Sequence, residues 1–146
     1  HSDFYAYNPL AHRHAPEIAA LARATSSIAA EFNFVPHSGP FARGIHVTVQ
    51  AHLRRAIKTP ELLEELARFY RGKPFVRVTD TLPRVKDVAS SNYAFMSAVA
   101  NGTSVAVMCV IDNLVKGAAG GAVQWLNRAY GFDETAGLSA PAPGWT

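Results

Sequence analysis

Hydrophobic and polar residues alternate most regularly between residues 45 and 53. From Ile45 to Leu53 the odd positions are apolar, while even positions such as His46 and Gln50 are polar. This period of two predicts a half-buried antiparallel strand. Residues 104–111 are instead an almost unbroken apolar run, which predicts a strand buried on both faces. Shorter strands are predicted at 28–35, where Phe32 and Phe34 alternate with polar neighbours, and at 75–78 and 93–99.

Helical signals lie between these strands. Pro16 suits a first helical turn and is followed by apolar residues at helical spacing, which predicts a helix over 15–25. Thr59 and Pro60 form a second helix start, followed by an apolar stripe to residue 70. Asp112 or Asn113 can cap a long last helix over 113–130. That helix contains Gly117, Gly120 and Gly121, so we expect a cofactor or another backbone to pack very close to it.

Together these elements predict an α+β fold with a mixed, largely antiparallel sheet and helices on one face. The Asn101-Gly102 pair predicts a hairpin between the last two strands. We expect one substrate-binding and dimerisation domain over 1–138, including the 113–130 helix, and an irregular tail over 139–146.

Composition narrows the class of protein. The 146 residues are 49% hydrophobic and 17% charged, which is typical of a globular chain. The net charge of +3 is spread along the chain, which argues against a nucleic-acid-binding tail. A single cysteine, Cys109, excludes an intrachain disulfide and favours a reducing compartment. No apolar stretch reaches about 18 residues, so no transmembrane helix is expected. The first residues contain no methionine and no signal-peptide pattern, and we expect a piece of something longer.

The strongest candidate for chemistry is the run His12-Arg13-His14 before a helix start. A helix N-terminus attracts anions, and a guanidinium can hold a carboxylate or phosphate through two hydrogen bonds. Histidine can exchange a proton near neutral pH. Two other interpretations stay open for these residues: a capped helix with exposed polar side chains, and a metal site built on the two histidines.

Two further segments carry polar residues at the ends of predicted elements. The loop between 36 and 44 holds His37 and Arg43, which fits a binding loop or an ordinary turn. Asn113 follows the buried strand at the start of the last helix, where it can hydrogen-bond a ligand amide or simply cap the helix. Lys116 lies one turn further on.

Four motifs, taken in order, resemble the N-acetyl-gamma-glutamyl-phosphate reductase family. They are His-Arg-His-x-Pro-Glu-Ile from residue 12, Phe-Val-Pro-His from residue 34 with Arg-Gly-Ile at 43–45, Asp-Asn-Leu-Val-Lys-Gly-Ala from 112, and Gly-Phe-Asp-Glu-Thr-x-Gly-Leu at 131–138. The resemblance implies the C-terminal domain of enzymes similar to glyceraldehyde-3-phosphate and aspartate-semialdehyde dehydrogenases. The family reduces an acyl phosphate to a semialdehyde in arginine biosynthesis, through a cysteine thioester and hydride from NADPH.

The resemblance also implies roles for individual residues. His12 corresponds to the histidine that activates the cysteine and transfers protons, with His14 as the second choice. The substrate pocket is expected to include Tyr7, Arg13, His14 and Glu17, with His37 and Arg43 near the phosphate. The nicotinamide is expected beside Asn113 and Lys116. No metal is expected.

Two parts of the family pattern are not found in these 146 residues: the glycine-rich nucleotide-binding loop and the Gly-Cys-Tyr nucleophile. Cys109 lies in an apolar run and is interpreted as a core thiol. NADP(H) is therefore expected to bind mainly to an N-terminal domain outside the chain, and the chain alone should be inactive. The expected partners are a small acyl phosphate and further protein chains. We expect a cytoplasmic homo-oligomer, a dimer or tetramer, or a complex with a chain carrying the nucleotide-binding domain, with no nucleic acid and no membrane. The alternatives are a non-catalytic oligomerisation module and a reductase of the aminoadipyl analogue in lysine biosynthesis.

Overall fold

A computed structural model describes residues 3–26, 29 and 31–144. The chain forms two compact units, His1–Phe41 and Ala42–Thr146. The first contains α1 (His14–Ser26) and the short strands β1 (Tyr5–Ala6) and β2 (His37–Ser38). The expectation of one domain over 1–138 stays a prediction.

In the first unit, β1 and β2 pair antiparallel, with Tyr5 opposite Ser38 and Ala6 opposite His37. Two further backbone hydrogen bonds continue this pairing, from Tyr7 N to Pro36 O at 3.0 Å and from Leu10 N to Phe34 O at 2.9 Å. The predicted helix over 15–25 is confirmed as α1. The strand predicted over 28–35 is wrong for residues 29 and 31–35, which form no strand ladder, while residues 27, 28 and 30 lie outside the described residues. Pro36 and Phe34 each accept one backbone hydrogen bond, from Tyr7 and Leu10 respectively, and these two isolated bonds do not make a sheet.

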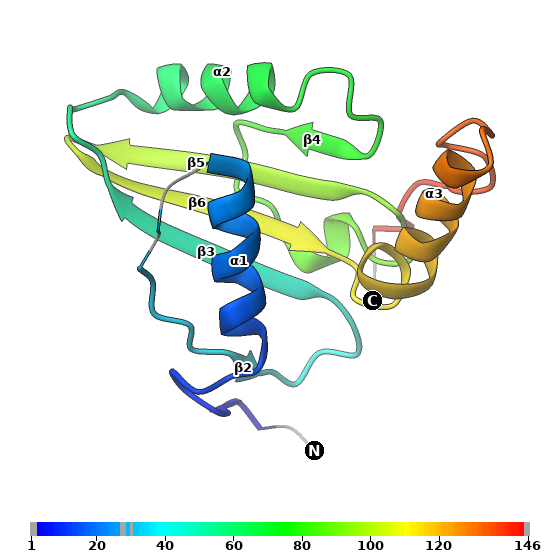
Figure 1. Ribbon diagram of the computed structural model, residues 1–146, viewed down its shortest axis with the longest axis horizontal. Coiled ribbons are helices and arrows are strands. Elements are labelled where there is room, and N and C mark those ends of the chain that lie inside the picture. Colours follow the sequence, from blue (N-terminus) through cyan, green and yellow to red (C-terminus); the bar gives the residue numbers. More distant parts are fainter. Residues whose placement is uncertain (1–2, 27–28, 30, 145–146) are drawn as a thin grey trace. The chain divides into compact units, whose positions relative to one another are not determined.

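The second unit is built on a four-stranded sheet in the order β3-β6-β5-β4 (Figure 1). Its strands are β3 (Ile45–His52), β4 (Val76–Val78), β5 (Ala94–Asn101) and β6 (Ser104–Ile111). β3 pairs antiparallel with β6, and β6 with β5, whereas β4 pairs parallel with β5. The mixed, largely antiparallel sheet and the α+β class are therefore confirmed. The two-residue loop Gly102-Thr103 closes the predicted hairpin, with Gly102 at φ 61°.

Helix α2 (Thr59–Phe69) packs against β4 and β5 on one side of the sheet (Figure 1). Its first residue is tied to the sheet, because Ala100 N donates to Thr59 Oγ1 at 2.9 Å. A 3-10 turn, η1 (Val85–Asp87), precedes β5, and a π-helical turn, η2 (Val115–Ala119), follows β6. Helix α3 (Gly120–Ala129) completes the unit. Residues 139–144 contain no helix or strand, and residues 145 and 146 of the predicted irregular tail lie outside the described residues.

The core lies in the second unit, around the end of the sheet that meets η1 and η2. Its fully or nearly fully buried apolar side chains are Phe75, Val88, Ala89, Ala98 and Val110. β6 is buried only in part. Val105, Met108 and Val110 are buried, Ser104 is exposed and the other four residues are half-buried, so the predicted burial on both faces holds for single residues and not for the whole strand.

The half-buried character predicted for residues 45–53 is wrong for the strand itself. Every residue of β3 is exposed, and Val49 is 55% exposed. The reason is position: β3 is an edge strand, and α2 contacts β4 and β5 instead. No helix among the described residues is long and apolar enough to span a membrane.

Candidate functional site

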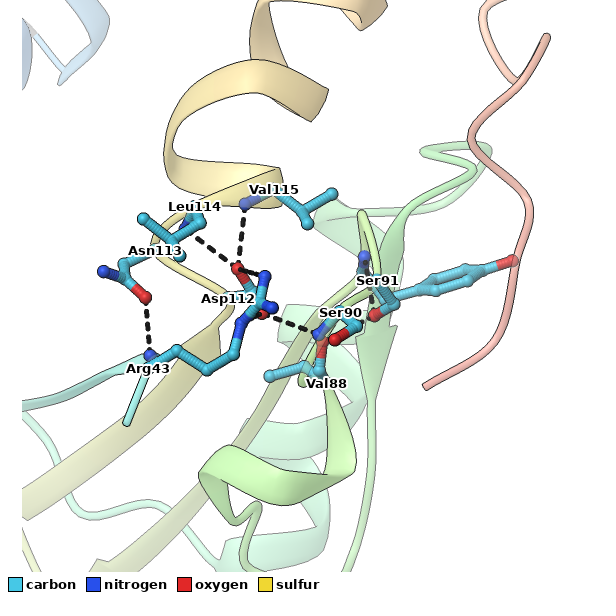
Figure 2. A network of polar contacts seen from close by, with 10 residues as sticks. Arg43, Val88, Ser90, Ser91, Asp112, Asn113, Leu114 and Val115 are labelled. Atoms are coloured by element: carbon cyan, nitrogen blue, oxygen red, sulfur yellow. Dashed lines mark hydrogen bonds and ion pairs between the residues drawn. The ribbon is translucent and has the colours of Figure 1, made fainter. Parts of the chain in front are cut away.

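The carboxylate of Asp112 is the centre of a polar network in the second unit (Figure 2). Asp112 directly follows β6, and its side chain is fully buried. Arg43 reaches it with two nitrogens: Nε lies 2.6 Å from Oδ2, and Nη2 donates to Oδ1 at 3.0 Å. Nη2 thus makes a charge-assisted hydrogen bond, whereas Nε contributes an ion-pair contact without a hydrogen bond.

Backbone donors complete the shell around Asp112. Leu114 N and Val115 N both donate to Oδ1 at 2.8 Å, and Ser90 N donates to Oδ2 at 2.6 Å. Asp112 therefore caps the turn that follows β6, one of the two residues predicted for that role. Burial alone would raise the pKa of its carboxyl, but the hydrogen bonds from Arg43 and the three backbone amides outweigh it and lower the pKa to about 2.

The side chain of Asn113 is held by Gly44, the residue that follows Arg43 in the chain. Gly44 N donates to Asn113 Oδ1 at 2.6 Å. Gly44 has φ 111°, and a Cβ there would lie 2.1 Å from Cγ1 of Val85, so only glycine fits. Residues 43 and 44 thus fix residues 112 and 113, and the carbonyl oxygen of Asn113 is occupied. Its amide nitrogen makes no hydrogen bond to the part of the chain that the structure describes, and it can donate to a ligand carbonyl.

The last helix is predicted over 113–130, and the chain is helical without interruption from 115 to 129. Its first turn differs from an ordinary α-helix, because a π-helical turn at 115–119 runs directly into α3 at 120–129. Ala119 N donates to Leu114 O at 3.1 Å, five residues back. A Cβ at Gly120 would lie 2.9 Å from Val115 O, and one at Gly121 would lie 2.7 Å from Lys116 O. Close approach is therefore found at Gly120 and Gly121, and the wide turn itself is one neighbour. At Gly120 the side chain of Asn92 is another, because a Cβ there would lie 2.5 Å from Asn92 Oδ1. A Cβ at Gly117 would lie 3.5 Å from its nearest neighbours, which is an ordinary contact.

Lys116 is not part of the Asp112 network. Its Nζ donates to Gln124 Oε1 at 2.5 Å and lies 5.5 Å from the ring centroid of Phe75. Burial lowers the pKa of this ammonium, against an opposing effect of Glu134.

In the first unit, His12 lies among aromatic rings that meet it edge-on. The ring centroids of His14, Phe34 and Tyr7 lie at 4.6, 5.4 and 5.5 Å. The backbone N–H of His14 donates to the ring nitrogen Nδ1 of His12 at 3.2 Å. A neutral ring that accepts at Nδ1 carries its proton on Nε2, so His12 presents an N–H donor there.

His37 has the opposite arrangement. Its Nδ1 lies 3.1 Å from the carbonyl oxygen of Val35, and a carbonyl only accepts, so Nδ1 carries the proton. Nε2 of the neutral His37 ring is then a free acceptor. The ring stacks on Phe4 with centroids 5.0 Å apart and planes within 4°.

The structure thus forms two groups from the residues predicted for the site. Tyr7, His12 and His14 lie together in the first unit, and Arg43 and Asn113 are joined by the Asp112 loop in the second. Arg13 and Glu17 are exposed near the start of α1. Sequence reasoning did not find the contact of Phe34 with His12, the donor at Ser90, or the Arg43–Asp112 pair. Only Asp112 had a signal, its place between a buried strand and a helix.

Two other side chains were candidates for chemistry. Cys109 is half-buried, and burial raises the pKa of its thiol, which makes it a poor nucleophile. His12 and His14 are ring neighbours, but no group of three or more His, Cys, Asp or Glu among the described residues is placed to hold a metal ion.

A family model, the semialdehyde dehydrogenase dimerisation domain, matches residues 1–113, and the chain belongs to this family. Similar curated proteins are N-acetyl-gamma-glutamyl-phosphate reductases. That of a Bradyrhizobium strain is 45% identical over 142 residues, covering 95% of this chain and 43% of the relative. That of a Dehalococcoides mccartyi strain is 41% identical, covering 96% of this chain and 42% of the relative. The chain therefore spans about two fifths of the length of these relatives. A solved structure, aspartate semialdehyde dehydrogenase II of Vibrio cholerae, aligns with TM-score 0.49 and 19% identity over 62% of this chain and 28% of its own.

Proposed function

We propose that the chain is the substrate-binding and proton-transfer part of an NADPH-dependent reductase that converts N-acetyl-glutamyl 5-phosphate to the semialdehyde. The observation that carries this proposal is the 40–45% identity of these reductases over about 95% of the chain. In this proposal the nucleophilic cysteine and the nucleotide-binding fold lie in protein outside the chain, which spans about two fifths of each relative. The chain by itself is then inactive.

We assign proton transfer to His12. In the tautomer that accepts the backbone N–H of His14 at Nδ1, Nε2–H can donate a hydrogen bond to the substrate oxygen as negative charge develops on it. Taking a proton from the thiol at Nε2 requires the other neutral tautomer and gives up the hydrogen bond from His14. The imidazolium formed in that step is the acid that can pass the proton to the substrate oxygen and return to the neutral ring. The edge-on rings of Tyr7 and Phe34 restrict the orientation of the imidazole, which is a requirement for directed proton transfer.

Substrate binding is assigned to exposed polar residues of the first unit. Arg13 at the start of α1 can hold an anionic group with two hydrogen bonds. His37 can accept a hydrogen bond at Nε2. The remaining substrate contacts are assigned to Tyr7, His14 and Glu17.

Arg43 has a different part in this proposal. Two of its nitrogens are committed to the buried Asp112 carboxylate, so its first task is to hold the loop in place. Its remaining guanidinium nitrogen can still face a phosphate.

The cofactor NADP(H) supplies the hydride when bound, mainly to the nucleotide-binding part outside this chain. The residues present fit a small share of that site. The free amide N–H of Asn113 can donate to a carboxamide oxygen, and the Gly44 bond orients it for this role. Lys116 is less suited, because its ammonium is engaged with Gln124.

We also propose that the protein acts as a homo-oligomer. The family description is a dimerisation domain. All eight residues of the edge strand β3 are exposed, among them Ile45, Val47 and Val49 on one side. An exposed apolar edge strand of this length is a pairing surface. The single half-buried cysteine and the biosynthetic relatives support a cytoplasmic location.

The test of the proposed reaction is an assay of the longer enzyme that contains this chain. N-acetylglutamate semialdehyde, phosphate and NADP⁺ should yield NADPH, and the aminoadipyl analogue should react at least about ten-fold more slowly in kcat/KM, since one methylene is worth about 1–3 kcal/mol. No turnover of either compound contradicts the proposal. Preference for the longer analogue assigns the enzyme to lysine biosynthesis instead. No specific observation favours the non-catalytic module.

A further inference from the structure

A depression of about 280 Å³ opens in the second unit, away from the Asp112 network. It lies where the end of α2 and the segment leading into β4 meet η2, α3 and the loop after α3. Neither Arg43 nor Asn113 lines it. The lining side chains are Phe69, Tyr70, Lys73, Pro74, Phe75, Val76, Lys116, Gln124, Arg128 and Glu134.

Positive charge dominates this depression. Three cations, Lys73, Lys116 and Arg128, face one carboxylate, that of Glu134. The carboxylate is already occupied, because Gln124 Nε2 donates to Oε1 at 2.6 Å and Arg128 Nη1 donates to Oε2 at 3.3 Å. Arg128 and Glu134 neutralise each other, so the two lysines account for the remaining charge.

Lys116 is only partly compensated, because Glu134 acts on its ammonium through a coulombic effect without forming an ion pair. An ammonium has three N–H donors, and only one is used, toward Gln124 Oε1. That oxygen is neutral and also accepts from Asn92 Nδ2 at 3.0 Å. Among the described residues no carboxylate forms an ion pair with Lys116, and its other close neighbour is the face of Phe75. A half-buried cation with unused donors is stabilised when an anion binds beside it.

Two further groups on the rim favour an anion with several oxygens. The side chain of Lys73 makes no hydrogen bond or ion pair within the described part of the chain. The Tyr70 hydroxyl keeps its proton at neutral pH, since burial raises its pKa, and it can donate. Lys73, Lys116 and Tyr70 all line the same small concavity, and their two ammonium groups and one hydroxyl are donors that suit a phosphate group, which has a double charge and three or more acceptor oxygens.

We propose that the depression between α2, β4 and α3 is a binding site for a small phosphate-bearing ligand, held by Lys116 and Lys73 with Tyr70 as a neutral donor. The site goes beyond the proposed reaction, because it contains none of the residues assigned to proton transfer or substrate binding. Its ligand would lie against the π-helical turn that follows Asn113. Occupancy of the site can therefore stabilise that turn.

The test is a titration of the 146-residue chain with inorganic phosphate, in which NMR chemical shifts of the backbone amides report binding. Ionic strength is held constant with sodium chloride. We expect saturable shifts concentrated at residues 69–76, 116 and 124–134. Lys116→Gln should raise the dissociation constant for phosphate about ten-fold or more, since it removes a charge-assisted hydrogen bond. Lys73→Gln should raise this constant several-fold. Lys58→Gln, outside the depression, should leave it unchanged.

Shifts spread over the surface, or equal phosphate affinity in all three variants, would overturn the proposal. Lys73 is exposed and makes no internal contact among the described residues, so its variant folds and decides the question even if Lys116→Gln does not fold. The titration needs no reductase activity. Its failure therefore leaves the proposed reaction standing, and a failed reductase assay leaves this site standing.

Discussion

Arg43 and Asp112 are 69 positions apart in the sequence and form a two-point ion pair around a fully buried carboxylate. The pair joins the first residues of the second unit to the loop that ends β6. The neighbouring residues repeat the connection, because Gly44 N–H donates to Asn113. The position of Asn113, the residue proposed to face the cofactor, therefore depends on a loop far away in the sequence.

Replacing Asp112 should destabilise the fold strongly. Asp112→Asn keeps the shape but removes the charge, so Arg43 loses its partner and the carboxylate's hydrogen bonds weaken. Breaking a buried ion pair costs about 3–5 kcal/mol, and since Arg43 is 27% exposed we expect about 3 kcal/mol in the free energy of unfolding. Urea unfolding followed by circular dichroism measures it.

The matched control is Glu65→Gln. Glu65 pairs with Arg68 on the exposed side of α2, and both side chains are at least half exposed. Such a surface pair contributes less than about 1 kcal/mol. Equal losses in the two variants would show that the Asp112 network does not hold the unit together.

The Asp112 contribution should also depend on pH. Its pKa is about 2 in the folded chain and about 3.9 in an unfolded one, so the folded state favours the ionised carboxyl. The added stability is full above the unfolded pKa and is lost as the pH falls through about 2. The difference in unfolding free energy between the native chain and Asp112→Asn should therefore stay constant from pH 7 to pH 5. It should shrink by about 2 kcal/mol on going to pH 2. A constant difference down to pH 2 would refute the lowered pKa.

Gly44 should not tolerate a side chain. Gly44→Ala forces a residue with a Cβ to φ 111° and into Val85, and we expect a loss of about 3 kcal/mol or more. Gly72→Ala is the control, because Gly72 has φ 75° but open space around its Cβ position, and its cost is about 1–2 kcal/mol. Thermal unfolding of both variants separates the clash from the backbone strain. If Gly44→Ala costs no more than Gly72→Ala, the loop is looser than its contacts indicate.

Cys109 should react slowly with a thiol reagent in the folded chain. Burial raises its pKa, so the thiolate is scarce at neutral pH. Absorbance of a released chromophore should show labelling at least about ten-fold slower in buffer than in denaturant. Equally fast labelling in the two solvents would reopen Cys109 as a candidate nucleophile.

The elements of the second unit could largely be predicted from the sequence, because their signals are local. The apolar run at 104–111, the helix start at Thr59 and the Asn101-Gly102 pair each mark a boundary within a few residues. Predictions failed where the outcome depends on partners. Phe32 and Phe34 alternate like a strand, yet only isolated hydrogen bonds hold that segment. The alternation in β3 is real, but burial depends on which helix covers the strand.

The candidate site could be predicted only as single residues. Asp112 was recognisable as a helix cap, while its pairing with Arg43 is a long-range contact that no spacing reveals. The ring cluster around His12 likewise depends on the pairing of residues 7–10 with 34–36, which brings Phe34 beside the histidine. The wide turn at 115–119 was signalled only by its glycines, and these fit either a cofactor or the chain's own backbone.

The most direct test of the central claim is the turnover of the longer enzyme when His12 is replaced by alanine. A general acid–base group contributes about 10²–10⁴-fold to the rate, and we predict that His12→Ala lowers kcat by that order with little change in stability. Lys58→Ala, at an exposed residue outside both the proposed site and β3, should leave kcat unchanged. A kcat for His12→Ala close to that of the native enzyme would contradict the assignment of proton transfer to this residue.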